Sequence, residues 1–182
     1  MNDVATSGAV PQYLSCGFVL EEGFPMEDLR RICASMATCA KEAGVRIVTG
    51  DTKVVNRGHG DGVYINTTGV GFLPEGRDLS GRNIRPGDAV IVSGTLGDHG
   101  ITIMSCRESL SFKAEIESDA APLNHLIAAV LEAAPHTRAF RDPTRGGAAT
   151  TLCEFAESAA LGIELDEEAI PVRRDVAAAC AL

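Results

Sequence analysis

The sequence predicts an α+β fold made of two α/β units. Strand-like runs and helical stretches alternate along the 182 residues, without the strict regularity of a doubly wound sheet. Residues 74–88 are rich in Pro, Gly, Arg and Asp, which is typical of a boundary between units. The apolar content of 45% is enough to bury a core in a chain of this length. We therefore assign residues 1–80 to an N-terminal unit and residues 85–182 to a C-terminal unit.

Three strands and one helix are expected in the N-terminal unit. The apolar run at residues 12–20 predicts the first strand. A helix is expected to begin near Pro25 and to stop at Gly44, because proline suits a first helical turn and glycine commonly ends a helix. The apolar run at residues 45–49 predicts a second strand, followed by a polar turn, and the β-branched run at residues 63–72 predicts a third.

The C-terminal unit is expected to be richer in helix. Its apolar runs predict two short strands, at residues 89–94 and 162–165. Apolar residues at helical spacing predict four helices, at about 98–107, 122–134, about 147–160 and from residue 172 onward.

Composition and charge argue against several classes of function. The net charge of -9 argues against nucleic acid as the main partner, because phosphate backbones are bound by basic patches. The chain has no run of about 18 apolar residues, and its first residues lack the basic and apolar regions of a secretory signal. The six cysteines include no C-x-x-C pair, which argues against a zinc site. We expect a cytoplasmic protein with free thiols.

The segment from Gly50 to Lys53 is the first candidate site. It places an acid, a hydroxyl and an amine on consecutive residues, Asp51, Thr52 and Lys53, directly after an apolar strand. A carboxylate suits a metal ion, whereas a hydroxyl and an ammonium suit phosphate oxygens. The same pattern is also typical of a solvated turn, so both interpretations stay open at this point.

The second candidate site runs from Asp142 to Gly147, at the start of a predicted helix. Gly146 and Gly147 would expose backbone N–H groups at the positive end of the helix dipole, where anions bind. Arg145 adds a fork of donors to this helix start. An ordinary helix cap, by Asp142 or by Thr144, explains the same residues equally well.

Two further segments carry weaker signals. Asn2 and Asp3, near the N-terminus, are typical of a helix cap. The glycine-rich residues 94–100 follow a predicted strand but lack the complete phosphate-loop and dinucleotide-binding patterns. His99 suits either a proton carrier or a structural hydrogen-bond donor, and the structural role is the commoner one.

Taken together, these segments resemble one family. The segment from Asn2 to Ser15 looks like the adenine-nucleotide element of the superfamily that includes aminoimidazole ribonucleotide synthetase and selenophosphate synthetase. The chain is similar in particular to the HypE family of carbamoyl dehydratases, which act in the maturation of nickel–iron hydrogenases. The strings that carry this resemblance are FVLEEGFP at 18–25, VTGDTKVV at 48–55, INTTGVG at 65–71, GDHG at 97–100 and RDPTRGG at 141–147.

The resemblance implies a fold, cofactors and a reaction. It implies two α/β units of the aminoimidazole ribonucleotide synthetase-like fold, both incomplete here, with an N-terminal ATP-binding domain whose strands build the shared barrel of a homodimer. The implied cofactors are ATP and Mg²⁺. The implied reaction is the ATP-dependent dehydration of a carbamoyl group on a C-terminal cysteine to a thiocyanate, the source of the iron cyanide ligand. The implied partners are the carbamoyltransferase HypF and the HypC–HypD iron scaffold complex, with no nucleic acid and no membrane.

The same resemblance implies roles for individual residues. Asp3 and Asp51 would hold Mg²⁺, and Lys53 would neutralise the transferring phosphoryl group. Lys53, Asp142 and Arg145 would be the catalytic residues. The residues expected to bind the cofactor are Asn2, Asp3, Gly50, Asp51, Thr52, Lys53, Thr144, Gly146 and Gly147.

The chain departs from this family in its length. Family members are nearly twice as long, and both their glycine-rich N-terminal tail and their terminal carbamoyl-carrying cysteine lack a counterpart here. Cys180 lies in an Ala-rich helical run and is not expected to be that cysteine. We therefore expect an internal fragment that is inactive alone and prone to associate. The alternatives are another ATP-dependent synthetase of the same superfamily and a non-catalytic fragment that binds partners.

Overall fold

The computed structural model describes residues 1–108, 116–144 and 146–181. The chain divides into two compact units, the first made of Met1–Asn83 and Pro122–Asp142, the second of Ile84–Ala121 and Pro143–Leu182. Two units were expected, but the compact units do not follow chain order, because residues 122–142 fold with the N-terminal part of the chain. The assignment of residues 1–80 and 85–182 to two functional domains stays a prediction.

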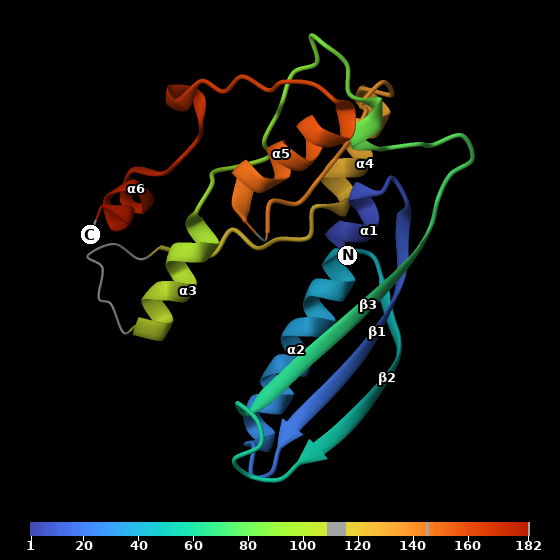
Figure 1. Ribbon diagram of the computed structural model, residues 1–182. Helices are drawn as coiled ribbons and strands as arrows, with labels where there is room; N and C mark the ends of the chain where they lie inside the picture. The colour runs from blue at the N-terminus through green and yellow to red at the C-terminus, as the bar shows by residue number, and fades with distance from the viewer. Residues whose placement is uncertain (109–115, 145, 182) are drawn as a thin grey trace. The chain divides into compact units, whose positions relative to one another are not determined.

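The first unit is built on a three-stranded sheet (Figure 1). Strands β1 (Val10–Glu21), β2 (Arg46–Val55) and β3 (Val63–Phe72) lie in the order β2-β1-β3. Strand β1 pairs with β2 in parallel and with β3 in antiparallel orientation. The three strands expected from the sequence are thus confirmed, although β2 is longer than expected.

One part of the expectation for β2 is wrong. The sequence predicted that the strand ends near residue 49 and that a polar turn follows, whereas β2 continues without a break to Val55. The reason is pairing: Gly50 to Val55 lie opposite Cys16 to Glu21 of β1, so their backbone groups are used in the sheet. Local turn chemistry is overridden by a neighbouring strand.

Helix α2 (Met26–Glu42) packs on one face of this sheet, as Figure 1 shows. Leu14, Cys16 and Leu20 of β1 point to this face, because side chains alternate along a strand. Cys16 and Leu20 are buried, and burial together with the nearby Cys33 of α2 raises the pKa of the Cys16 thiol. We call this side the covered face and the opposite side the open face. All six cysteines are free thiols, as expected.

Two helices complete the first unit. Helix α1 (Asn2–Thr6), which the sequence indicated only as a cap, packs against α4 (Asn124–Ala133). Their shared core contains three buried residues and two partly buried ones that pack against them: Ala5, Ile127, Leu131, Leu79 and Phe140. The short 3-10 helix η1 (Gly81–Asn83) follows the sheet.

The second unit contains the helices α3 (Asp98–Glu108), α5 (Gly147–Ala159) and α6 (Arg174–Cys180), with the 3-10 helix η2 (Glu167–Ala169). The three α-helices agree with the prediction, whereas η2 was not expected. The two strands expected here, at residues 89–94 and 162–165, are wrong: no strand is formed in the described part of this unit. Residues 89–94 pair with no strand among the described residues, and Ile91 within this run is 88% exposed.

Nowhere in the described stretches of the chain is a helix both long and apolar enough to cross a membrane.

Candidate functional site

The open face of the sheet carries two of the predicted site residues. Asp51 and Lys53 are two residues apart on β2, so both point to this face, opposite Gly17 and Val19 of β1. Both are exposed. An acid and an amine side by side on an accessible strand can bind a cation and a phosphate group together. The structure thus brings this acid and amine together.

Thr52 is placed differently from its two neighbours. Its side chain belongs to the covered face, in line with Phe18 of β1 and Ile65 of β3. Its backbone N–H donates a hydrogen bond to Oδ1 of Asp51 at 2.8 Å. The sequence suggested three polar groups at one edge, whereas the strand alternation separates the hydroxyl from the other two. Within this segment, Thr52 therefore contributes its backbone to the arrangement of the carboxylate.

Asp3 lies on α1, with an exposed side chain whose Oδ2 is 3.9 Å from the N-terminal amine. The neighbouring Val4 packs against Gly69 and Gly71 of β3 on the covered face, whereas Asp51 belongs to the open face. The part of the chain that the structure describes holds no group of three or more His, Cys, Asp or Glu side chains suited to a metal ion. Asp3 and Asp51 as joint ligands of one Mg²⁺ stay a prediction.

Asn2 has a structural contact within the first unit. Its Oδ1 accepts a hydrogen bond from the backbone N–H of Leu123 at 2.9 Å, directly before α4. The next residue, the buried Asn124, donates from Nδ2 to the carbonyl of Ala43 at 2.9 Å. These two amides connect α1, α4 and the end of α2. Asn2 therefore has a role in positioning helices, beside the cofactor role that was predicted.

The second candidate site lies at the start of α5. Gly146 and Gly147 have φ angles of 75° and 66°, in the left-handed region that favours glycine. A Cβ at Gly146 would collide with the Thr150 side chain. The N-cap residue, Gly146, has no side chain that could cap the helix, and the first N–H groups of a helix are suited to an anion. The expected helix start is confirmed; Thr144 precedes it, Asp142 ends the first unit, and Arg145 lies outside the described residues.

A buried carboxylate in the second unit was missed at the sequence level. Asp98, which begins α3, is 2% exposed. Its Oδ2 accepts a hydrogen bond from Thr95 at 2.7 Å, and its Oδ1 lies 3.5 Å from the guanidinium of Arg173, before α6. The adjacent His99 is exposed, and its Nδ1 is 2.9 Å from Oγ of Ser118. No local pattern could reveal the ion pair, because its partners are far apart in the sequence.

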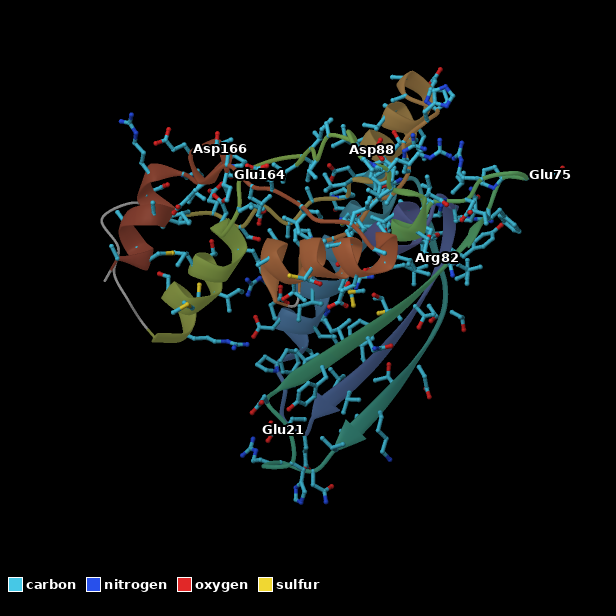
Figure 2. All side chains as sticks on the ribbon, turned by 45° about the horizontal axis from the view of Figure 1, so that its top comes forward. Glu21, Glu75, Arg82, Asp88, Glu164 and Asp166 are labelled. Atoms are coloured by element: carbon cyan, nitrogen blue, oxygen red, sulfur yellow. The ribbon has the colours of Figure 1, made fainter. Side chains whose placement is uncertain are left out.

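The contacts of Glu21, the last residue of β1, were also missed from the sequence, where this residue appeared only within the string FVLEEGFP. Figure 2 shows it at the end of the strand, beside the connection between β2 and β3. Its carboxylate accepts hydrogen bonds from the backbone N–H groups of Gly58 and Gly62. These two contacts lower the pKa of Glu21, with smaller contributions from Arg57 and His59. The sequence shows an acid at the end of a predicted strand and a glycine-rich segment further along the chain, but nothing in it indicates that the two meet.

Proteins named HypE are similar in sequence to this chain over nearly its whole length. Carbamoyl dehydratase HypE of Azotobacter vinelandii is 58% identical over 180 residues, which are 99% of this chain and 53% of that protein. A crystal structure of HypE in complex with ATP superposes with a TM-score of 0.95 at 50% identity, covering 99% of this chain and 54% of that one. A HypE–HypF complex gives the same TM-score and identity, covering 99% and 59%. The chain thus spans about half the length of the curated relatives it matches.

The resemblance to HypE and the aminoimidazole ribonucleotide synthetase-like fold, both inferred from the motifs, are therefore confirmed. The model of the AIR synthase related protein N-terminal domain matches residues 1–73, and that of the C-terminal domain matches residues 85–180. The chain belongs to the AIR synthase related protein family, and it carries sequence of both of that family's domains.

Proposed function

We propose that this chain is part of an ATP-dependent carbamoyl dehydratase that acts in nickel–iron hydrogenase maturation. One observation carries the proposal: 99% of the chain matches, at 50% identity and a TM-score of 0.95, a HypE whose structure contains ATP. The residues on the open face suit the same chemistry, because Asp51 and Lys53 offer a carboxylate and an ammonium to a metal nucleotide. The complete reaction is proposed for a chain of the relatives' length.

The proposed reaction starts from a carbamoyl group on the sulfur of a C-terminal cysteine. The γ-phosphoryl group of ATP moves to the carbamoyl oxygen, and the nitrogen releases one proton. The carbon–oxygen bond then breaks, inorganic phosphate leaves, and the nitrogen releases its second proton. The products are ADP, phosphate and a thiocyanate, whose cyanide group is destined for the hydrogenase iron. No oxidant or reductant is needed, because the carbon keeps its oxidation level.

The residues of this chain would act mainly by positioning charge. Lys53 would neutralise negative charge on the transferring phosphoryl group, and Asp51, with Asp3, would hold Mg²⁺ through hard oxygen ligands. When bound, Mg²⁺ would draw the phosphate oxygens together and offset their charge. The N–H groups at the start of α5 suit an anionic phosphate, and Arg145 and Asp142 are the other proposed catalytic residues.

The proposal includes an assembly and a location. We infer a cytoplasmic homodimer whose strands join in a shared barrel, which would use the open face of the sheet. The exposed Tyr64, Val70 and Phe72 of β3 lie on this face and are suited to a subunit contact. HypF is proposed as a partner because a HypE–HypF complex matches this chain, and the HypC–HypD complex as the acceptor of the cyanide group.

A chimera tests this proposal directly. The matching segment of Azotobacter vinelandii HypE is replaced by this chain, and conversion of its carbamoylated cysteine with ATP is followed by the mass loss of one water. We expect dehydration, and we expect Lys53→Ala to slow it by at least about a hundredfold, because phosphoryl transfer depends on positioned positive charge. The same variant should lower the thermal stability little, since Lys53 is exposed.

Lys41→Ala serves as the matched control. Lys41 is also exposed but lies on α2, away from the open face, so its loss should leave the rate within about twofold. A folded chimera that binds ATP but forms no thiocyanate would refute the proposed reaction. Equal rates for the Lys53→Ala and Lys41→Ala variants would refute the role of Lys53.

A further inference from the structure

The connection between β2 and β3, residues 56–62, is fastened to the end of β1. Oε1 of Glu21 accepts a hydrogen bond from the N–H of Gly58, and Oε2 accepts one from Gly62 at 3.0 Å. The backbone N–H of Glu21 also donates to the carbonyl of Gly62 at 2.8 Å, and that of Glu22 donates to Val55 at 2.8 Å. We call these four contacts the Glu21 clasp. It joins the end of β2, the connection and the end of β1.

The glycines of the connection are suited to this contact. Gly58 and Gly62 have φ angles of 82° and 81°, which other residues rarely adopt. With this backbone, two N–H groups converge on one carboxylate, as they do in the anion-binding turns of other proteins. Hydrogen bonds to an ionised acceptor are stronger than neutral ones. The clasp is thus an anion site that the chain fills with its own side chain.

Strand β2 lies at an edge of the three-stranded sheet, and its second half, Gly50 to Val55, is held there through its parallel pairing with Cys16 to Glu21 of β1. Val55 lies opposite Glu21, two residues after Lys53 and on the same face. The clasp therefore fixes the strand just beyond the two residues that the proposed reaction needs most.

We propose that Glu21 is a positioning residue, which holds the second half of β2 so that Asp51 and Lys53 stay in place on the open face. The inference rests on the proposed function only in that the proposed function gives Asp51 and Lys53 their role in the reaction. The contact itself is independent of ATP, of a carbamoyl group and of any partner. Its test can therefore fail or succeed separately from the test of the dehydration.

Ionised groups around the clasp determine how it responds to pH. Arg57 and His59 of the connection favour the carboxylate form of Glu21 and lower its pKa, while the nearby acids Glu22 and Asp61 are exposed. Because the pKa is lower in the folded chain, the clasp stabilises the fold above the ordinary glutamate pKa of about 4.3. It is lost as the pH falls through the lowered value. We expect the clasp to be intact at neutral pH and to open only in acid.

Amide exchange and proton shifts of the 182-residue chain test the inference. We expect the N–H protons of Gly58 and Gly62 to shift together as Glu21 titrates, below the usual range for glutamate. In Glu21→Gln this titration should vanish, and the amides of Gly58, Gly62 and Lys53 should exchange at least about tenfold faster. Glu21→Asp, which keeps a carboxylate, should restore part of the protection.

Glu22→Gln is the matched control. It removes the same charge at the next position, but only the backbone of Glu22 takes part in the clasp, so exchange should stay within about twofold of the unsubstituted chain. The clasp would be overturned if the N–H proton shifts of Gly58 and Gly62 did not change as Glu21 titrates. This titration is measured on the unsubstituted chain, so it does not depend on whether a variant folds. A faster exchange at the glycines with an unchanged Lys53 amide would overturn the positioning role.

Discussion

The first unit contains every strand that the sequence predicted for it, whereas the second unit contains none of its two predicted strands. Both units carry β-branched apolar runs of similar character, such as residues 63–72 and 89–94. The difference lies in the partners. Residues 63–72 pair with β1, whereas residues 89–94 have no neighbouring strand among the described residues. A β-branched apolar run favours the extended conformation, but a sheet forms only where a second strand completes the backbone hydrogen bonds.

Helices do not show this difference between the two units. The helices predicted from apolar spacing are present in both units, because a helix forms its hydrogen bonds within its own segment. Helix α3, for example, begins at Asp98 as expected, directly after residues 89–94, which stay without a strand partner. The difference between prediction and structure in the second unit is therefore confined to its strands.

The largest expected effect concerns the core of the first unit. Leu131 is 8% exposed and packs with Ala5 and Ile127. We expect Leu131→Ala to lower the free energy of unfolding by about 2–5 kcal/mol, because it removes buried methyl groups and leaves a cavity. Urea unfolding followed by circular dichroism measures this change. Leu126→Ala, at a 45% exposed position of the same helix, should cost less than half as much; equal costs would contradict the assigned core.

A smaller effect is expected in the second unit. Asp98→Asn keeps the shape of the side chain but removes the charge that faces Arg173, which is itself partly exposed. We expect a loss of about 1–3 kcal/mol, because the buried amide satisfies its surroundings less well than the carboxylate does. Thermal unfolding measures the loss. Asp119→Asn, at an exposed position, is the control, and an Asp98→Asn protein as stable as this control would contradict the ion pair's role.

The candidate site was predictable to the extent that it depends on short segments. The glycine start of α5 and the polar run on β2 could both be identified from neighbouring residues. The sequence could not show that Asp51 and Lys53 share a face while Thr52 does not, because this depends on the strand continuing through Gly50. The Asp98–Arg173 pair and the contacts of Glu21 join distant segments, and a single sequence contains no local signal for such contacts.

The most direct test is hydrogen–deuterium exchange of the 182-residue chain, measured peptide by peptide. It shows whether the first unit forms its predicted strands in solution while residues 89–94 of the second unit remain unpaired. We expect slow exchange at residues 63–72, whose N–H groups are used in pairing with β1, and nearly unprotected exchange at residues 89–94. Equal protection of the two segments would contradict the account. It would mean that residues 89–94 do find a strand partner in solution.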